Sequence, residues 1–301
     1  MSVKYKRVRA GDALFNMVNY TLFAAFTFIC IWPFYYIFIN SISNNELVSA
    51  GRIVFAPRGI HLNNYIEVIK LPGLIRATFI SLARTMLGTA LTLLVSSFMA
   101  FLFCQREMWW RKFWYRFLVV TMYFNAGFIP VFLNIRRLGL MNNFLVYIIP
   151  GIIAPFYIIL MKTYIESIPE SLFESAKIDG AGYICMYQNL VIPLSVPILA
   201  TIAVFTAVGQ WNSYMDTLFY VTDSSLFTLQ YILYQYLNEL NALANMLAQS
   251  KNLTNIDPSL FLTPTAIRMT VSMVIILPIF IVYPIGQKYF LNGLMIGAIK
   301  G

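Results

Sequence analysis

The polar stretch that organises the chain is residues 169–197, PESLFESAKIDGAGYICMYQNLVIPLSVP. It lies between two long apolar segments, and it is the one place where a very apolar chain becomes polar and patterned. Four charged side chains fall within about three helical turns, and glycines and prolines divide the stretch into short pieces. The charged residues are Glu170, Glu174, Lys177 and Asp179. This pattern predicts an ordered polar loop between two buried segments.

The composition sets the class of protein. Of 301 residues, 59% are apolar and 11% are charged, against roughly 25% charged in a soluble domain. The mean hydropathy is +0.72. Several apolar runs reach about 20 residues, the length that a helix needs to cross a bilayer. The fold class expected is therefore an all-α polytopic membrane protein, read as a single domain over residues 1–301.

The net charge of +9 does not indicate nucleic-acid binding. The 21 Lys and Arg residues form short clusters beside apolar runs, which is typical of contacts with anionic lipid headgroups and of membrane topology. The chain has one histidine and three isolated cysteines, with no metal-ligand or redox spacing. Neither a metal site nor a catalytic residue is expected.

Six segments are long and apolar enough to cross a membrane. The first is too long for the apolar region of a signal peptide, about 7 to 15 residues, and is read as an anchor. Six crossings place both termini on one side. The expected crossings are Ala13–Asn40, Leu74–Cys104, Phe113–Leu133, Phe144–Met161, Ser195–Leu218 and Met269–Phe290.

The distribution of positive charge predicts which side that is. With cytoplasmic termini, twelve Lys and Arg residues lie inside and eight outside, and the inside clusters flank the first two crossings. The loop at residues 167–193 and the tail at residues 291–301 would then be cytoplasmic. One positive residue, Arg84, lies deep in the second crossing. Either Arg84 faces the interior of the helix bundle or a water-filled cavity, or the helix is long enough to project outward and place Arg84 near the membrane surface.

The connection at residues 219–264 would be external in this topology. Its leucines and tyrosines recur at helical spacing, which predicts an amphipathic helix. Two interpretations remain open: a lid packed on the helices, or a docking surface for a partner outside the membrane. The apolar positions are Leu226, Leu229, Leu233, Tyr236, Leu237 and Leu240.

Polar and aromatic residues gather where the fifth crossing ends. Amides and a carboxylate next to rings suit a sugar, whose hydroxyls need hydrogen bonds and whose apolar faces stack on aromatic side chains. An interfacial aromatic belt explains the rings equally well. The residues offered as a substrate pathway are Asn125, Gln210, Trp211, Asn212 and Asp216.

Within the polar stretch, local signals predict a helical hairpin. Ser167 and Glu170 have the spacing of a capping box, Asp179-Gly180 has the form of a helix stop, and a second helix from Ala181 to Val191 should end at Pro193. The charged face of the first helix is either simply solvated or fits a positively lined cleft on another subunit.

The same stretch resembles the EAA loop of ATP-binding-cassette (ABC) importer permeases. Glu174-Ser-Ala-Lys-Ile-Asp-Gly-Ala181, followed by Tyr187, Leu190, Ile192 and Pro193, matches that pattern in order and spacing, with Ser175, Leu190 and Ile192 as small departures. Other segments are similar to the carbohydrate branch of the type I importers, the MalG type, and especially to permeases for oligosaccharides from complex polysaccharides. They are Phe128-Ile-Pro130, Leu138-Gly-Leu140 with Asn142, Trp211-Asn212 and the tail Gly293–Gly301. Asn125-Ala126-Gly127 departs from that subgroup, which bears on the pore lining.

The resemblance implies a permease of the bacterial cytoplasmic membrane that imports a carbohydrate by alternating access. Its implied partners are a second homologous permease, two ABC ATPases that bind ATP and Mg, an extracytoplasmic solute-binding protein and membrane lipid. The chain itself lacks a phosphate-binding loop, so no cofactor and no ATPase activity are expected. The coupling residues implied are Glu170, Glu174, Ala176, Lys177, Asp179, Gly180 and Ala181.

Two other functions remain alternatives at this point. An ion-coupled secondary transporter would need ionisable groups near the membrane midplane, and Arg84 has no evident acidic partner in the sequence. A membrane subunit that senses a ligand without transporting it would fit the composition and would give the polar loop no role.

Overall fold

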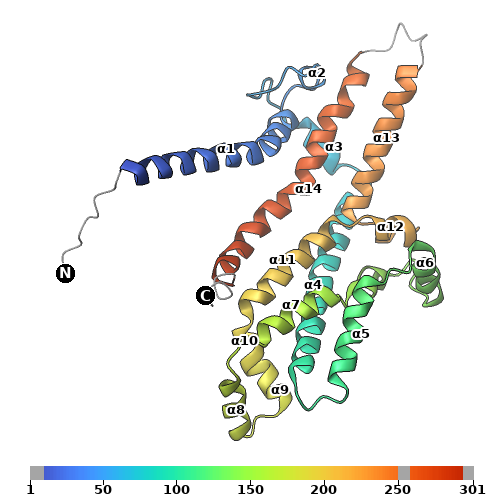
Figure 1. Ribbon diagram of the computed structural model, residues 1–301. Coiled ribbons are helices and arrows are strands. Elements are labelled where there is room, and N and C mark those ends of the chain that lie inside the picture. The colour runs from blue at the N-terminus through green and yellow to red at the C-terminus, as the bar shows by residue number, and fades with distance from the viewer. Residues whose placement is uncertain (1–9, 250–257, 294–301) are drawn as a thin grey trace. The chain divides into compact units, whose positions relative to one another are not determined.

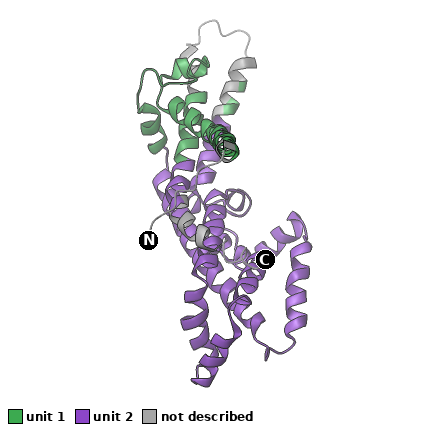
Figure 2. Cartoon of the chain, turned by 60° about the vertical axis from the view of Figure 1, so that its left-hand side comes forward, with its two compact units in different colours: residues 1–69, 240–274 green, residues 70–239, 275–301 purple. Residues whose placement is uncertain are grey.

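The computed structural model describes residues 10–249 and 258–293, and in these residues every regular element is a helix. The chain divides into two compact units, residues 1–69 with 240–274 and residues 70–239 with 275–301 (Figure 2). Each unit is described by itself below.

The first unit begins with the apolar helix α1 (Ala10–Ser41), followed by α2 (Asn45–Ser49) and α3 (Asn63–Ile69). The Asn44 side chain caps α2 by accepting the backbone N–H groups of Glu46 and Leu47 at 2.9 and 3.3 Å. The small apolar core of this unit consists of Ile39, Val48, Ile53 and Ala266.

The second unit contains both candidate functional regions. Its long helix α4 (Leu74–Cys104) packs most extensively against α11 (Val196–Asn212) and α7 (Pro155–Ile165). The shorter elements are α5 (Arg111–Tyr123), α6 (Phe128–Arg137), η1 (Phe144–Tyr147), η2 (Ile149–Gly151), α8 (Glu170–Ile178), α9 (Tyr183–Met186), η3 (Tyr187–Val191), α10 (Ile192–Leu194), α12 (Met215–Tyr220) and η4 (Ser224–Leu226). Figure 1 shows α8 beyond one end of the α4–α11 pair and α6 and α12 toward the other end.

Between Ala77 and Ala100, the buried face of α4 is made of small and polar residues rather than of its many leucines. Ala77, Ser81, Arg84, Gly88 and Thr92 are buried and recur every three or four positions, which places them on one face. Leu82, Leu87 and Leu94 are exposed in the isolated chain. Small residues let helix backbones approach closely, and apolar side chains facing outward suit lipid, so this arrangement fits a membrane helix.

The helices agree with a multi-pass protein, but most crossings are bent. In the part of the chain that the structure describes, two helices are long and apolar enough to cross a membrane alone, Leu14–Ser41 and Leu74–Cys104, and the second has the bounds expected from the sequence. Three bent pairs raise the number of possible crossings to five, and the segment Thr265–Ile281 within α14 (Pro258–Gly293) is a shorter apolar helix. The count of six crossings stays a prediction.

The segment expected to cross at Phe113–Leu133 is not one continuous helix. The chain breaks into α5 and α6, which meet at 118°. Gly127 adopts a φ of +82°, which favours glycine, and the Asn125 side chain accepts the Gly127 N–H at 2.9 Å. The local turn therefore interrupts a segment that is apolar on both sides.

The segments expected at Phe144–Met161 and Ser195–Leu218 are also broken. The first consists of η1, η2 and α7, with a bend of 50°. The second is α11, which ends at Asn212 before extended backbone at Ser213 and the short helix α12. Each break brings polar backbone groups into the second unit, where they need hydrogen-bond partners.

The amphipathic helix expected after the fifth crossing is confirmed as α13 (Leu229–Gln249). Leu229 and Leu233 are buried, and the Leu229 N–H donates to Ser81 Oγ on α4 at 2.8 Å. The start of α13 therefore packs on α4 within the second unit. Residues 250–257 and the glycine-rich tail from residue 294 lie outside the described residues.

Candidate functional site

The polar stretch forms helix α8 with a well-defined stop. Gly180 has a φ of +79°, its N–H donates to the Lys177 carbonyl at 3.1 Å, and the Ala181 N–H donates to the Ala176 carbonyl at 2.9 Å. These two bonds form a Schellman motif, in which a left-handed glycine satisfies the last carbonyls of a helix. The expected stop at Asp179-Gly180 is confirmed, with Asp179 as the capping residue.

The expected capping box at the start of α8 is wrong. Pro169 occupies the capping position without a side-chain hydrogen bond, and Ser167 Oγ instead donates to the Tyr164 carbonyl at 2.6 Å. The Glu170 carboxylate instead pairs with Arg106 in the loop between α4 and α5. Neither Ser167 nor Glu170 therefore caps the backbone of α8.

The second helix of the hairpin also differs from expectation. It begins at Tyr183 and continues through Pro193 to Leu194, by way of the π-helical turn η3. In that turn the Ile192 N–H bonds to the Tyr187 carbonyl, five residues back, so the wider turn accommodates the proline ring. Tyr187 Oη lies 2.7 Å from Ser97 Oγ, which ties this helix to α4.

Helix α8 is thinly packed on the rest of the unit. None of its residues is buried, and among the described residues of α8 the apolar side chains that pack on the nearby core are Phe173 and Ala176, with Ala181 following after the stop. Ile178 is 85% exposed, although it is apolar. Helix α8 is therefore held to its own unit by few apolar contacts.

Two ion pairs join α8 to the loop between α4 and α5. Arg106 Nη2 lies 2.8 Å from Glu170 Oε1, and Lys177 Nζ lies 2.9 Å from Glu107 Oε1. The hydrogen bond from Lys177 holds the pKa of the Glu107 carboxyl below its ordinary value, and the same bond raises the pKa of Lys177. Both groups are therefore charged at neutral pH.

Glu174 differs from its two charged neighbours on α8. It is exposed, and no residue of the described ranges 10–249 and 258–293 forms an ion pair with it. One turn separates it from each of the paired residues Glu170 and Lys177. The structure thus leaves one carboxylate of the EAA-like stretch available to a partner.

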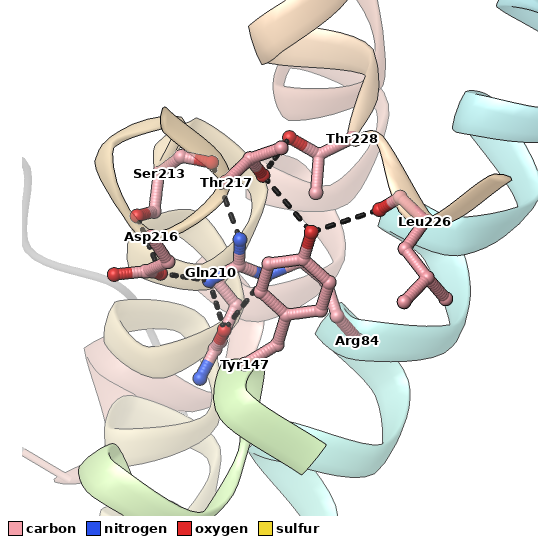
Figure 3. A network of polar contacts seen from close by, with 8 residues as sticks. All are labelled: Arg84, Tyr147, Gln210, Ser213, Asp216, Thr217, Leu226 and Thr228. Atoms are coloured by element: carbon pink, nitrogen blue, oxygen red, sulfur yellow. Dashed lines mark hydrogen bonds and ion pairs between the residues drawn. The ribbon is translucent and has the colours of Figure 1, made fainter. Parts of the chain in front are cut away.

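A second candidate region surrounds Arg84, which is only 2% exposed (Figure 3). Its Nη2 lies 2.7 Å from Asp216 Oδ2, and its Nε and Nη2 donate to Gln210 Oε1 at 3.1 and 2.9 Å. Its Nη1 donates to the Ser213 carbonyl at 3.3 Å, and the guanidinium lies 4.6 Å from the centre of the Tyr147 ring. Arg84 therefore faces the interior and satisfies the backbone that the break after α11 leaves unpaired.

An open cavity of about 430 Å³ adjoins this network. Aromatic rings and a row of polar positions on α11 and α12 line it. Among the described residues, the Thr206 hydroxyl, buried in the cavity wall, has no hydrogen-bond partner, and a Cβ placed on Gly209 would meet no atom within 4 Å beyond its own helix backbone. The lining comprises Arg84, Val131, Ile135, Val146, Tyr147, Pro150, Gly151, Tyr157, Phe205, Thr206, Gly209, Gln210, Ser213, Asp216 and Tyr220.

The sequence matches a known protein family over most of its length. Residues 92–295 fit the model of the binding-protein-dependent transport system inner membrane component. The chain belongs to this permease family. Members of this family are permease subunits of ABC transporters. Across the described residues, no group of three or more His, Cys, Asp or Glu side chains could hold a metal ion.

Relatives and a solved structure extend the similarity to nearly the whole permease. The sequence of this chain is 33% identical over 290 residues to that of the polygalacturonan/rhamnogalacturonan transport system permease protein YtcP of Bacillus subtilis. The match covers 96% of this chain and 99% of the relative. It is 26% identical to the arabinooligosaccharides transport system permease protein AraQ of Halalkalibacterium halodurans, covering 93% and 94%. A chain in the crystal structure of a bacterial ABC transporter involved in the import of alginate, an acidic polysaccharide, superposes with a TM-score of 0.81 at 29% identity, covering 95% of the permease and 100% of that chain.

The structure brings together two of the five residues offered as a substrate pathway. Gln210 and Asp216 line the cavity. Trp211 is buried against α14 and donates its Nε1–H to the Ile275 carbonyl at 3.2 Å, Asn212 is exposed outside the lining, and Asn125 belongs to the break between α5 and α6.

Sequence reasoning missed the acidic partner of Arg84 in the permease. Asp216 lies 132 residues further along the chain, and nothing local connects the two positions. Thr206 and Gly209 were also missed, although each lies on the same helical face as Gln210 or one position from it. Polar or small residues recurring on an otherwise apolar helix were the available signal.

Proposed function

We propose that the permease is the membrane subunit of an ATP-driven importer that carries oligosaccharides derived from a polysaccharide across the bacterial cytoplasmic membrane. Its partners in this proposal are a second homologous permease, two ABC ATPases that bind ATP and Mg, and an extracytoplasmic solute-binding protein. The chain contributes neither an ATPase site nor a cofactor. Both termini and α8 lie on the cytoplasmic side.

The observation that carries the proposal is the form of α8. It is an exposed, sharply ended helix whose central carboxylate, Glu174, has no ion-pair partner in the described residues. A cleft on an ATPase subunit that offers positive charge and an apolar wall would engage Glu174 and Ile178 together. Ala176, Asp179, Gly180 and Ala181 act by building the helix end, as their hydrogen bonds and packing support.

The substrate class is supported by the cavity and by the names of the relatives. Tyr157 and Phe205 supply aromatic rings, and Thr206 and Gln210 supply hydrogen-bonding groups. Sugars combine apolar faces with many hydroxyls, so a wall of this kind suits them. Relatives named for polygalacturonan, rhamnogalacturonan and arabinooligosaccharides favour an oligosaccharide.

Transport in this proposal proceeds by alternating access. Closure of the ATPases moves α8, and the helices rock as rigid bodies so that the cavity opens to one side and then to the other. Arg84 and Cys104 are 20 residues apart on α4, so the helix spans about 30 Å between the cavity and the α8 end. One straight helix therefore connects the two candidate regions.

The ion-coupled transporter is less well supported. Asp216 supplies the buried acidic partner that the sequence did not reveal, so the ion pair removes one objection to it. The family match outweighs this, because its members depend on a binding protein. A sensing subunit would leave α8 without a role.

The proposal is tested by uptake into proteoliposomes that contain the permease with its partner subunits. Uptake of a pectin- or arabinan-derived oligosaccharide should require ATP and the binding protein. Thr206→Val should lower uptake severalfold while the complex remains assembled. Thr201→Val is the matched control, because Thr201 is on the same helix, donates to the Pro197 carbonyl at 3.0 Å and lies outside the cavity lining. Uptake by the chain alone without nucleotide would contradict the proposal.

A further inference from the structure

We infer that the loop between α4 and α5 holds α8 in position through two ion pairs of opposite polarity, Arg106 with Glu170 and Glu107 with Lys177. Arg106 and Glu107 are then positioning residues for coupling. Glu170 and Lys177 then serve to hold α8 on its own subunit, and Glu174, which lies between them on the same helix face and has no ion-pair partner in the described residues, is left for the ATPase. The inference rests on the proposed coupling role of α8.

The two ion pairs diverge from adjacent loop residues toward separate positions on α8, and the four residues Arg106, Glu107, Glu170 and Lys177 are called the fork below. Arg106 and Glu107 are adjacent, so their Cα atoms are about 3.8 Å apart. Their partners Glu170 and Lys177 are seven residues apart on α8, which is about 10.5 Å along the helix axis. The two loop side chains therefore diverge from one place and hold α8 at both ends, on either side of Glu174.

The order of charges fixes the register of the helix. The loop reads positive then negative, and the helix reads negative at Glu170 and positive at Lys177. If α8 slid by one turn, Arg106 could meet Glu174, but Glu107 would lose Lys177. If α8 were reversed, each loop charge would face a like charge, which is repulsive.

Few other contacts could hold α8 in place. A cavity of about 330 Å³ lies between the loop, the end of α7 and α8, and both ion pairs border it. Apolar packing here is limited to Phe173 and Ala176, which are only partly buried. The fork is thus the main polar link between α8 and the helices.

The link leads directly into α4. The loop begins at Gln105, immediately after α4 ends at Cys104, and Arg111 Nη1 donates to the Cys104 carbonyl at 3.3 Å. A displacement of α8 is therefore passed through Arg106 and Glu107 to the end of the helix that carries Arg84. Single exposed ion pairs contribute little to stability. The fork accordingly sets position and direction more than stability.

The test uses charge swaps in the full complex of permease, partner permease, ATPases and binding protein, in nanodiscs. Arg106→Glu and Glu170→Arg are made singly and together, as are Glu107→Lys and Lys177→Glu. Each single reversal should lower substrate-stimulated ATPase activity severalfold while the subunits still copurify, and each double swap should restore at least half of it. Lys112→Glu is the control, since Lys112 forms no ion pair with a residue of the described ranges 10–249 and 258–293, and it should leave coupling within about twofold.

The outcomes separate this inference from the proposed function. Wild-type coupling in the single reversals, or double swaps no better than the singles, would overturn the fork and leave the docking role of Glu174 intact. If a reversal prevents assembly, Arg106→Gln combined with Glu107→Gln replaces it, and coupling equal to the wild type in that variant would equally overturn the inference. Normal coupling in Glu174→Lys would instead remove the proposed function.

Discussion

Arg84 and Asp216 form an ion pair inside the helix bundle, with Nη2 and Oδ2 2.7 Å apart and with Arg84 only 2% exposed. Removing one partner of a buried pair leaves the other charge without compensation. Asp216→Leu should therefore destabilise the permease by about 3 kcal/mol, the lower end of the range, because Asp216 itself is 35% exposed.

The matched control for that change is the double variant Arg84→Met with Asp216→Leu. It removes both charges and should recover most of the lost thermal stability, measured as the unfolding midpoint in detergent. Equal midpoints for Asp216→Leu and the wild type would show that the pair does not hold α4 against the break between α11 and α12.

A second prediction concerns the close approach of α4 and α11 at Gly88. A Cβ at this position would lie 2.8 Å from Gln210 Nε2 and 3.0 Å from its Cδ. Since Gln210 Oε1 accepts two hydrogen bonds from Arg84, the side chain cannot move without loss. Gly88→Ala should cost about 1–3 kcal/mol through overpacking, seen as a lower unfolding midpoint.

Gly209 offers the opposite case on the facing helix. A Cβ added at Gly209 would meet no atom of the described residues within 4 Å beyond its own helix backbone, so Gly209→Ala should leave stability unchanged or raise it by about 0.5–1 kcal/mol. Because Gly209 lines the cavity, the same change should reduce oligosaccharide uptake. A stable variant with full uptake would argue against a substrate path along this wall.

The pair between Glu107 and Lys177 makes a prediction about pH. The lowered pKa of Glu107 means that its contribution is present above the ordinary value of 4.5 and is lost as the pH falls through the lowered pKa. The raised pKa of Lys177 means that its contribution is present below 10.5 and is lost as the pH rises through the raised pKa. The nearby charges of Arg106 and Glu170 act in the same directions, on Glu107 and Lys177 respectively.

The ratio of coupled ATPase activity in Glu107→Gln to that in the wild type should therefore be constant between about pH 6 and pH 9. A ratio that returns to one within this window would mean that the pair titrates there and does not hold α8 at neutral pH.

The sequence predicts the class of fold and the helix stop at Gly180 because both depend on local composition. Helix α4 has the expected bounds, since a long apolar run between Gly73 and Gln105 leaves little freedom. The bends are different: the turn at Asn125–Gly127 depends on one positive φ and one side-chain bond within apolar sequence. Hydropathy alone does not detect such a break.

The hydrogen-bond network around Arg84 could not be predicted from the sequence, for a different reason. The hydrogen-bond and ion-pair partners of Arg84 come from segments more than 120 residues away, and the packing of α4 on α11 brings them together. The same holds for the fork, because Arg106 and Glu107 contact α8 some 60 to 70 residues later. Periodicity identifies a charged face on a helix but not the element that it meets.

The central claim is that Glu174 on α8 couples the permease to an ATPase, and charge reversal tests it most directly. In the purified complex, substrate-stimulated ATPase activity should be abolished by Glu174→Lys, because the reversed charge would face the positive cleft that the account assigns to the ATPase. Lys112→Glu should leave that activity within about twofold of the wild type. Wild-type coupling in Glu174→Lys, with all subunits present, would contradict the account.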